Sequence, residues 1–185
     1  INEEIERLRL QATTTLVSRR DCIIVASVSC IYGLGNPEEF NKGSVNLKVG
    51  ELVRRNALLR RLIESQYQRN DMELKSGTFR VRGDTVEIYP AYEEQALRIE
   101  LWGDQVERIS KINPLTGATI TKLDKCAIYP AKHFVTDRPS IERAVRLIRA
   151  ELSECLTELR GMGKLLEAQR LESRTHFDVE MLLEI

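Results

Sequence analysis

Two arginines in one short segment carry the clearest chemical signal in this sequence. Residues 77–84 read Gly-Thr-Phe-Arg-Val-Arg-Gly-Asp, so that Arg80 and Arg82 alternate with apolar residues. Because side chains alternate between the two faces of a β-strand, we expect both guanidinium groups to face outward, opposite an apolar pair that anchors the strand. Guanidinium groups on a rigid strand can form paired hydrogen bonds with carboxylates. The segment therefore predicts a recognition surface.

The charges around these arginines indicate what they bind. Basic and acidic residues are equal in number, at 28 each, so no global positive field favours nucleic acid. Residues 51–82 hold eight basic and four acidic residues, whereas residues 83–110 hold seven acidic and two basic ones. Such a mixed surface repels phosphates and favours a protein partner with complementary charges. The alternative is a solvated sheet face whose ion pairs contribute less than about 1 kcal/mol each.

A second hypothesis assigns DNA binding to the helix expected from residue 52 to about residue 69. Its Arg54, Arg55, Arg60 and Arg61 should lie mostly on the outside of that helix. Binding through these residues would give an affinity for single-stranded DNA that falls steeply with salt.

A turn that contains Ser27, Ser29, Tyr32 and two glycines could contact phosphate or a nucleic-acid backbone. It follows residues 22–26, an unbroken apolar run that predicts a strand buried on both faces of a parallel sheet. Open α/β sheets bind ligands where such strands end. However, the sequence contains no G-x-x-x-x-G-K-[ST] and lacks the third glycine of a dinucleotide fingerprint. A structural strand-to-helix turn is therefore the alternative, and an autonomous ATPase is disfavoured.

Metal and nucleophilic chemistry find little support in the sequence. The four cysteines form no C-x-x-C pair, and neither His133 nor His176 supplies further ligands at short spacing. We interpret the cysteines as reduced thiols that serve as small apolar residues, and the histidines as ordinary surface or packing residues. We therefore expect no cofactor in this segment.

The sequence predicts a cytoplasmic protein without a membrane partner. No apolar run approaches the roughly 18–20 residues that span a bilayer, and the acidic first residues do not resemble a signal peptide. The first residue is not Met, and the last residues lie in a helical pattern without a cap. We expect a piece of a longer protein.

The periodicity predicts an α+β fold, a small antiparallel β-sheet module with helices, flanked by the end of an α/β domain and by a helical region. Helical spacing covers residues 2–19, and a short strand is expected over residues 44–50. From residue 78 to residue 129, alternating strands are separated by turn signals such as Gly83-Asp84 and Gly103-Asp104. Residues 139–183 form either two helices separated by a glycine-containing break or one long bent helix.

Four phrases of the sequence together resemble the UvrB family, whose members belong to the bacterial UvrABC excision-repair nuclease. They are Ser-Val-Ser-Cys-Ile-Tyr-Gly-Leu-Gly from residue 27, Gln-Tyr-Gln-Arg-Asn-Asp from residue 66, the arginine segment at residues 77–84, and Leu-Leu-Glu-Ala-Gln-Arg-Leu-Glu-Ser-Arg-Thr from residue 165. The transcription-repair coupling factor carries a similar β module and is the alternative. It is not expected to share the first and last phrases.

The resemblance implies three parts and a parent protein. Residues 1–43 would end a RecA-like motor domain, residues 44–136 would form the UvrA-binding domain, and residues 137–185 would begin a helical domain packed on the motor. Members of the family are helicase-like, ATP-dependent damage-verification proteins that UvrA loads onto damaged DNA and that recruit UvrC. ATP and Mg²⁺ are thus implied for the parent protein. The Walker A lysine, the acidic Mg²⁺ motif, the arginine fingers and the DNA-clamping hairpin lie outside this segment, which should bind without hydrolysing ATP.

The resemblance also implies roles for residues at matching positions. The charged residues that match the family's UvrA contacts are Arg69, Arg80, Arg82, Arg98 and Glu100. Ser27, Ser29 and Tyr32 match a motor motif near the nucleotide and DNA surfaces, without individual roles.

Overall fold

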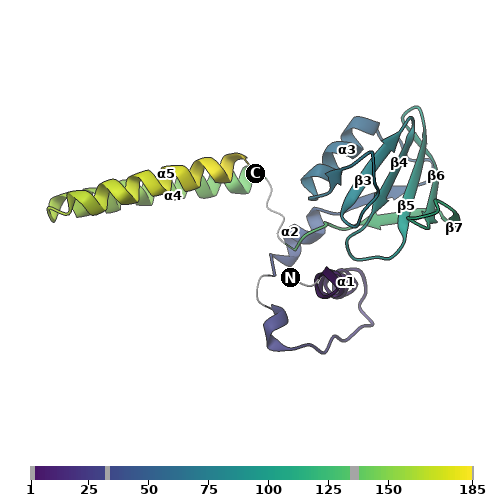
Figure 1. The fold of residues 1–185 in the computed structure, drawn as a ribbon, viewed down its shortest axis with the longest axis horizontal. Coiled ribbons are helices and arrows are strands. Elements are labelled where there is room, and N and C mark those ends of the chain that lie inside the picture. The colour runs from purple at the N-terminus through teal and green to yellow at the C-terminus, as the bar shows by residue number, and fades with distance from the viewer. Residues whose placement is uncertain (1–2, 32–33, 134–137, 185) are drawn as a thin grey trace. The chain divides into compact units, whose positions relative to one another are not determined.

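A six-stranded sheet and a pair of long helices dominate the structure, a computed structural model that describes residues 3–31, 34–133 and 138–184 (Figure 1). The chain divides into two units, residues 1–135 and residues 136–185. The elements of the first unit are α1 (Glu3–Ser18), the 3₁₀ turn η1 (Val28–Ile31), α2 (Pro37–Lys42), β1 (Val45–Lys48), α3 (Arg55–Glu64), β2 (Gln68–Arg69), β3 (Thr78–Arg82), β4 (Thr85–Tyr89), β5 (Ala96–Trp102), β6 (Gln105–Ile112), β7 (Thr119–Leu123) and β8 (Lys125–Ile128). The second unit contains α4 (Arg138–Gly161) and α5 (Leu165–Glu184).

The strands follow one another through the six-stranded sheet in the order β2-β3-β4-β5-β6-β7. Every neighbouring pair is antiparallel except β2 and β3. The strands β1 and β8 pair with each other in a separate antiparallel sheet. The predicted α+β fold is thus confirmed. We call α3 and β1 to β8 together the β-module.

Two glycines make the tight turns that set the register of the β-module. Gly83 connects β3 to β4 with φ +60°, and Gly103 connects β5 to β6 with φ +59°. Two-residue hairpin turns that start with a positive φ need glycine there, and their twist matches that of the flanking strands. Both turns predicted from the sequence are therefore confirmed.

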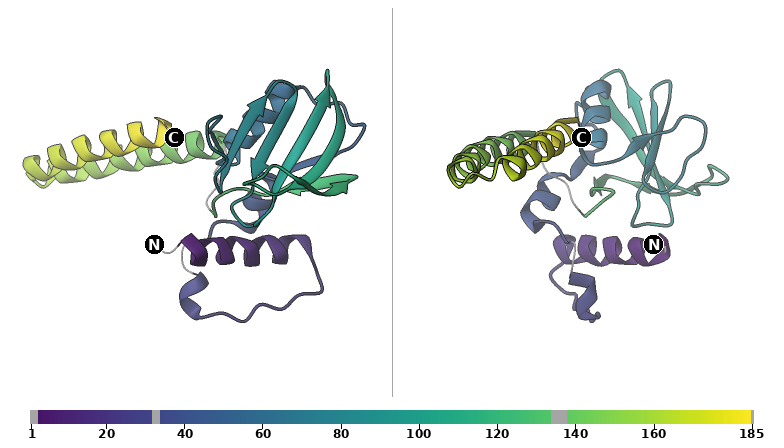
Figure 2. Two further views of the ribbon diagram at one scale, coloured as in Figure 1. Left: turned by 45° about the vertical axis from the view of Figure 1, so that its right-hand side comes forward. Right: turned by 60° about the vertical axis from the view of Figure 1, so that its left-hand side comes forward.

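The core of the β-module lies between the sheet and α3 (Figure 2). One face of the sheet contributes Phe79, Val86, Ile88, Ile99 and Ile109, all fully buried. The helix α3 covers them with two leucines at positions 58 and 62, which are also fully buried. Because strand side chains alternate between faces, the residues between these core positions point to the opposite face of the sheet.

The helix α3 ends earlier than its sequence pattern predicts. It stops at Glu64 rather than near Arg69, because Gln66 adopts a left-handed conformation with φ +66°. The chain then turns so that Tyr67 enters the core, where its hydroxyl donates a 2.7 Å hydrogen bond to the carbonyl of Tyr129. Arg69 consequently lies in the short strand β2, beside β3.

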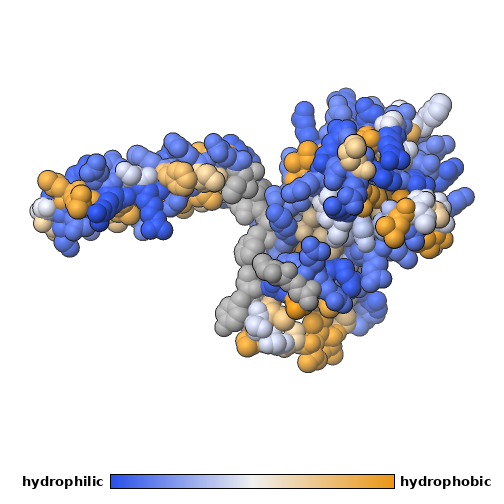
Figure 3. Space-filling view, in the orientation of Figure 1, coloured by the Kyte–Doolittle hydropathy of each residue, from blue (hydrophilic) through white to orange (hydrophobic). Residues whose placement is uncertain are grey.

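The prediction of a buried parallel strand at residues 22–26 is wrong for this structure. These residues form no strand, and the side chains of Ile23 and Val25 are 93% and 95% exposed. A strand of a parallel sheet needs neighbouring strands on its edges, and none of the described residues supplies one to this segment. Apolar surface is consequently exposed here (Figure 3).

The predicted first helix is confirmed as α1, but most of its large apolar side chains are exposed rather than buried. Leu10 is buried against Phe40 and Tyr92, whereas Ile5, Leu8 and Leu16 are exposed. The exposed leucines and isoleucine therefore give α1 an apolar side that no described residue covers.

The second unit is an antiparallel pair of helices, with α4 and α5 side by side (Figures 1 and 2). Gly163 has φ +74°, a left-handed conformation that ends the first helix and excludes one long bent helix. Leu152, Leu156 and Ala168 are buried between the two helices. Within the described parts of the chain, no helix combines the length and apolar character that crossing a membrane requires.

Candidate protein-docking surface

The face of the six-stranded sheet opposite α3 carries alternating positive and negative side chains. The strand register places Arg80 opposite Glu87, Glu87 opposite Arg98, and Glu100 opposite Arg108. We call this surface the charged face, and its members are Arg80, Arg82, Glu87, Arg98, Glu100 and Arg108.

One carboxylate joins two arginines at the centre of the charged face. The Nε of Arg80 donates to Oε2 of Glu87, and the Nε of Arg98 donates to Oε1 of the same carboxylate at 2.8 Å. The Nη2 of Arg98 also donates to the carbonyl of Gly117 at 3.0 Å. Glu87 is 5% exposed, so these interactions take place largely away from water. The three side chains carry one net positive charge.

Two opposing effects set the pKa of Glu87. Burial raises it, because a carboxylate loses hydration inside the protein, whereas the hydrogen bonds and charges of Arg80 and Arg98 lower it. The arginines prevail, and the pKa of Glu87 lies below its ordinary value of 4.5. The carboxylate is therefore ionised at neutral pH and can compensate a guanidinium on each side.

Acid should destabilise the β-module partly through Glu87. A carboxylate whose pKa is lowered on folding contributes stability above its ordinary pKa of 4.5, and this contribution is lost as the pH falls through the lower, folded-state pKa. Urea unfolding at steps between about pH 6 and pH 3 should thus show a steeper fall in the free energy of unfolding for the wild type than for Glu87→Gln. Equal slopes in the two proteins would contradict this assignment.

Arg82 and Arg69 differ from the central arginines in their surroundings. Arg82 is exposed, and in the described structure it forms no ion pair. Arg69 pairs with Asp71 at 2.8 Å, and the same carboxylate accepts a 3.0 Å hydrogen bond from the amide of Val81. The hydrogen bond from Arg69 lowers the pKa of Asp71. Asp71 therefore ties the segment after β2 to the edge of β3.

The structure corrects one expectation for the predicted docking residues. Arg82 is freely exposed as expected, but the side chain of Arg80 is only 15% exposed, because Glu87 on the neighbouring strand binds it. Glu100 and Arg108 form a 3.2 Å pair nearer the surface. The structure thus places Arg80, Arg82, Arg98 and Glu100 on one face, with Arg69 beside its edge strand.

Reasoning from the sequence missed Glu87 and Arg108 on this face, and Trp102 beside it. Glu87 occupies the alternating position of its strand that points to the charged face, so the pattern Thr-Val-Glu-Ile-Tyr of β4 carried a usable signal. Trp102 ends β5 on the same side as Arg98 and Glu100, and it is 77% exposed. An exposed tryptophan beside charged groups is typical of protein interfaces.

The serine turn is not part of the charged face. The hydroxyls of Ser27 and Ser29 lie 3.0 Å apart, and both residues are exposed. Tyr32 lies outside the described residues. The role that the resemblance implies for these three residues stays a prediction.

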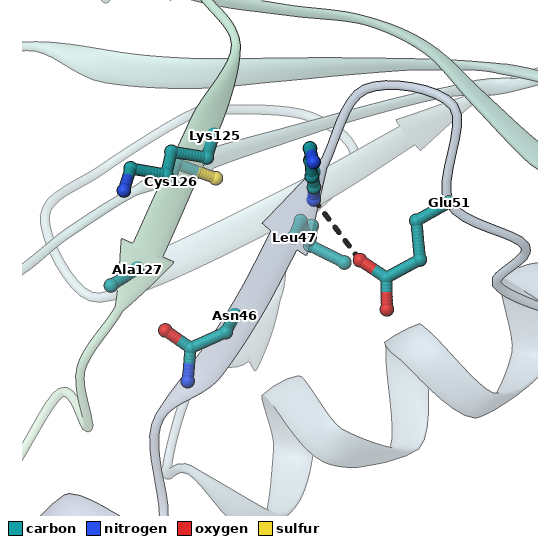
Figure 4. Close-up of a pocket in the computed structure, with 7 residues that line it drawn as sticks. Asn46, Leu47, Glu51, Lys125, Cys126 and Ala127 are labelled. Atoms are coloured by element: carbon teal, nitrogen blue, oxygen red, sulfur yellow. Dashed lines mark hydrogen bonds between the residues drawn. The ribbon is translucent and has the colours of Figure 1, made fainter.

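A hollow of about 480 Å³ opens on the sheet formed by β1 and β8 (Figure 4). Lys48, Glu51 and Lys125 are among its lining residues, and the amide of Lys48 donates a 3.1 Å hydrogen bond to the carboxylate of Glu51. None of the charged-face residues lines it. The charged face is instead an open surface, as suits contact with another protein rather than with a small molecule.

Comparisons with known proteins identify two domains along the chain. The model of the UvrB interaction domain matches residues 45–134, and the model of the UvrB third helical domain matches residues 139–185. Over its whole length, the chain is 62% identical to the UvrABC system protein B of Gemmatimonas aurantiaca, and 55% identical to those of Rhodopirellula baltica and Geobacillus kaustophilus. It spans 26% of the length of the first two relatives and 28% of the third.

The fold and the matched domains define the class of this chain, which contains an interaction domain followed by a helical domain. The chain belongs to the UvrB family of excision-repair proteins. Nothing in these matches supports the alternative relation to the transcription-repair coupling factor.

Proposed function

We propose that this chain is the part of a UvrB-type repair protein that docks on UvrA through the charged face. The observation that carries the proposal is a rigid sheet that presents guanidinium and carboxylate groups side by side, without a cavity for a small ligand among the described residues of that face. Such a pattern selects a partner with complementary charges. The name of the matching domain, an interaction domain, supports the same assignment.

The arginines of α3 make DNA the weaker candidate. At about 100° per residue, Arg55, Arg60 and Arg61 fall on three different sides of the helix rather than in one stripe. Arg55 donates a 2.8 Å hydrogen bond to the carbonyl of Gly83, and Arg61 donates one of 3.1 Å to the carbonyl of Ser44. Arg55 and Arg61 are thus partly occupied within the protein, and the three arginines form no continuous phosphate-binding surface.

The parent protein is proposed to supply the remaining functions. It would be an ATP-dependent, Mg²⁺-requiring component of a cytoplasmic excinuclease that binds damaged DNA and recruits UvrC. Residues 1–43 would complete its motor domain, and residues 137–185 would begin its helical domain. The exposed apolar residues of α1 and of residues 22–26 support this proposal, because a larger domain would cover them.

Reversing the charge of Arg82 should weaken UvrA binding without unfolding the chain. The Arg82→Glu variant replaces an exposed cation by an anion facing the partner's carboxylates, so we expect at least about a tenfold increase in the dissociation constant. Isothermal titration calorimetry with purified UvrA measures it, and circular dichroism checks the fold.

Arg60→Glu provides the matched control, because Arg60 is exposed on α3 and undergoes the same change in charge. Its affinity for UvrA should equal that of the wild type. Wild-type affinity of Arg82→Glu, or an equal loss in both variants, would contradict docking through the charged face.

A further inference from the structure

We propose that Glu87 and Arg98 are positioning residues that hold Arg80 as a preformed receptor for one carboxylate of the docking partner. The inference rests on the proposed function of the charged face and divides its residues by task. Arg80 would contact the partner, whereas Glu87 and Arg98 would act through Arg80.

Arg80 has hydrogen-bonding capacity left for a partner. In the described structure it donates only through Nε, to Glu87. A guanidinium has five N–H donors, so four on the two terminal nitrogens stay available. The side chain keeps 15% of its surface exposed, which gives a partner access to that end while the rest is held in place.

Arg98 is held from two sides and is less able to bind a partner. Its Nε and Nη2 both bind Oε1 of Glu87, and Nη2 also donates to the carbonyl of Gly117. That carbonyl lies in the turn between β6 and β7. Arg98 therefore fixes the carboxylate of Glu87 from the side opposite Arg80.

The net charge of Arg80, Glu87 and Arg98 indicates the chemistry of the partner group that Arg80 would bind. Two guanidinium groups and one carboxylate leave one positive charge, which one partner carboxylate would neutralise. A carboxylate also matches the fork of a guanidinium, because two parallel N–H donors can bind its two oxygens. A phosphate would bring additional negative charge near Glu100, which lies two residues from Arg98 on the same face. The partner group is therefore an Asp or Glu side chain.

A double-mutant cycle tests the division of tasks in the 185-residue chain. Arg80→Ala should weaken UvrA binding by about 30-fold, and Glu87→Gln, which keeps the shape and removes the charge, by about tenfold. Because Glu87 acts through Arg80, the double variant should bind no worse than Arg80→Ala alone. A purely structural role of Glu87 would change thermal stability but leave the effect of Arg80→Ala on binding unchanged.

Two further variants complete the test. Glu64→Gln makes the same chemical change at an exposed position of α3 and should bind as the wild type does. Arg98→Lys keeps the charge but cannot bind Glu87 and Gly117 as a fork, so it should weaken binding by about tenfold, with no further loss when combined with Arg80→Ala. It provides the test if Glu87→Gln does not fold.

The nature of the partner group is tested from the UvrA side. Alanine substitution of the acidic residues of UvrA should find one whose loss weakens binding to the wild-type chain but not to Arg80→Ala. The absence of any such residue would overturn the carboxylate assignment.

The outcomes separate this inference from the proposed function. If the wild-type chain does not bind UvrA, or if Arg82→Glu binds normally, the docking function itself fails. If the wild type binds and Arg82→Glu does not, wild-type affinity of Glu87→Gln or Arg98→Lys, or strictly additive losses in the cycle, would overturn the positioning roles.

Discussion

Replacing Arg80 by glutamate is expected to destabilise the β-module by about 3–5 kcal/mol, the cost of leaving a buried charge without its partner. Glu87 lies directly across the strand pair and is nearly buried, so the variant would place two carboxylates side by side. Arg98 would still pair with Glu87.

Near-ultraviolet circular dichroism during urea unfolding measures this loss selectively. Every tyrosine and the single tryptophan of the chain precede residue 136, so the signal reports the first unit and not the helical pair. The control Arg60→Glu, which makes the same change on the exposed surface of α3, should shift the free energy of unfolding by less than about 0.5 kcal/mol. Equal stability of the two variants would show that the Arg80–Glu87 pair is not effectively buried.

A practical consequence follows for tests of docking. A charge reversal at Arg80 changes folding and binding together, whereas the exposed Arg82 allows binding to be tested alone. The sequence predicts that both arginines are recognition groups, and the structure shows that they differ in burial, because Glu87 binds Arg80 whereas Arg82 is exposed.

The second large effect, a loss of UvrA binding, is expected when Arg80, Glu87 and Arg98 are all replaced by apolar residues. The triple variant Arg80→Met, Glu87→Leu, Arg98→Met removes all three charges together, so no buried charge is left without a partner. Substitutions of this kind in other proteins are often neutral or stabilising by about 1–4 kcal/mol. The free energy of unfolding should therefore equal or exceed that of the wild type.

The same triple variant should lose UvrA binding by more than about 100-fold, because no guanidinium receives the partner's carboxylate. Calorimetric titration measures the affinity, and urea unfolding measures the stability on the same protein sample. A stable variant that binds normally would show that the cluster serves the fold alone. An unfolded variant would show instead that the charges are needed to specify the sheet.

The fold of the β-module could be predicted largely because its signals are local. The alternation of apolar residues along β3 to β6 and the glycines at positions 83 and 103 specify strands and tight turns within a few residues. The N-cap of α2 is equally local, because the side chain of Asn36 accepts a 2.9 Å hydrogen bond from the amide of Glu38.

The predictions from the sequence were wrong where the structure of a segment depends on residues that are distant in the sequence. The unbroken apolar run at residues 22–26 has the composition of a buried strand, but burial depends on neighbouring strands that the described residues do not supply. The end of α3 depends on Gln66, a residue type with no strong preference for the left-handed conformation it adopts. Tertiary contacts of Tyr67 decide that turn instead.

The sequence predicted the types of charged residue that lie on the candidate site, but not which of them bind one another. That Arg98 meets Glu87 depends on the register between β4 and β5, which is set by the long connection over residues 90–95 rather than by a two-residue turn. Tyr92 anchors this connection, because its buried hydroxyl accepts a hydrogen bond of 2.9 Å from the amide of Tyr129. Such a long-range anchor leaves no local pattern in the sequence.

The pairing of β1 with β8 has a consequence for how such a module is inherited. Val45 lies opposite Ile128, so the chain arrives at the β-module and departs from it at adjacent positions. A segment whose first and last strands pair with each other can be inserted into a host protein at a single point. The host then needs to bridge only the gap between two neighbouring strands. Gain or loss of a docking function can thus occur as one insertion or deletion, and the same property makes the β-module suitable for transplantation.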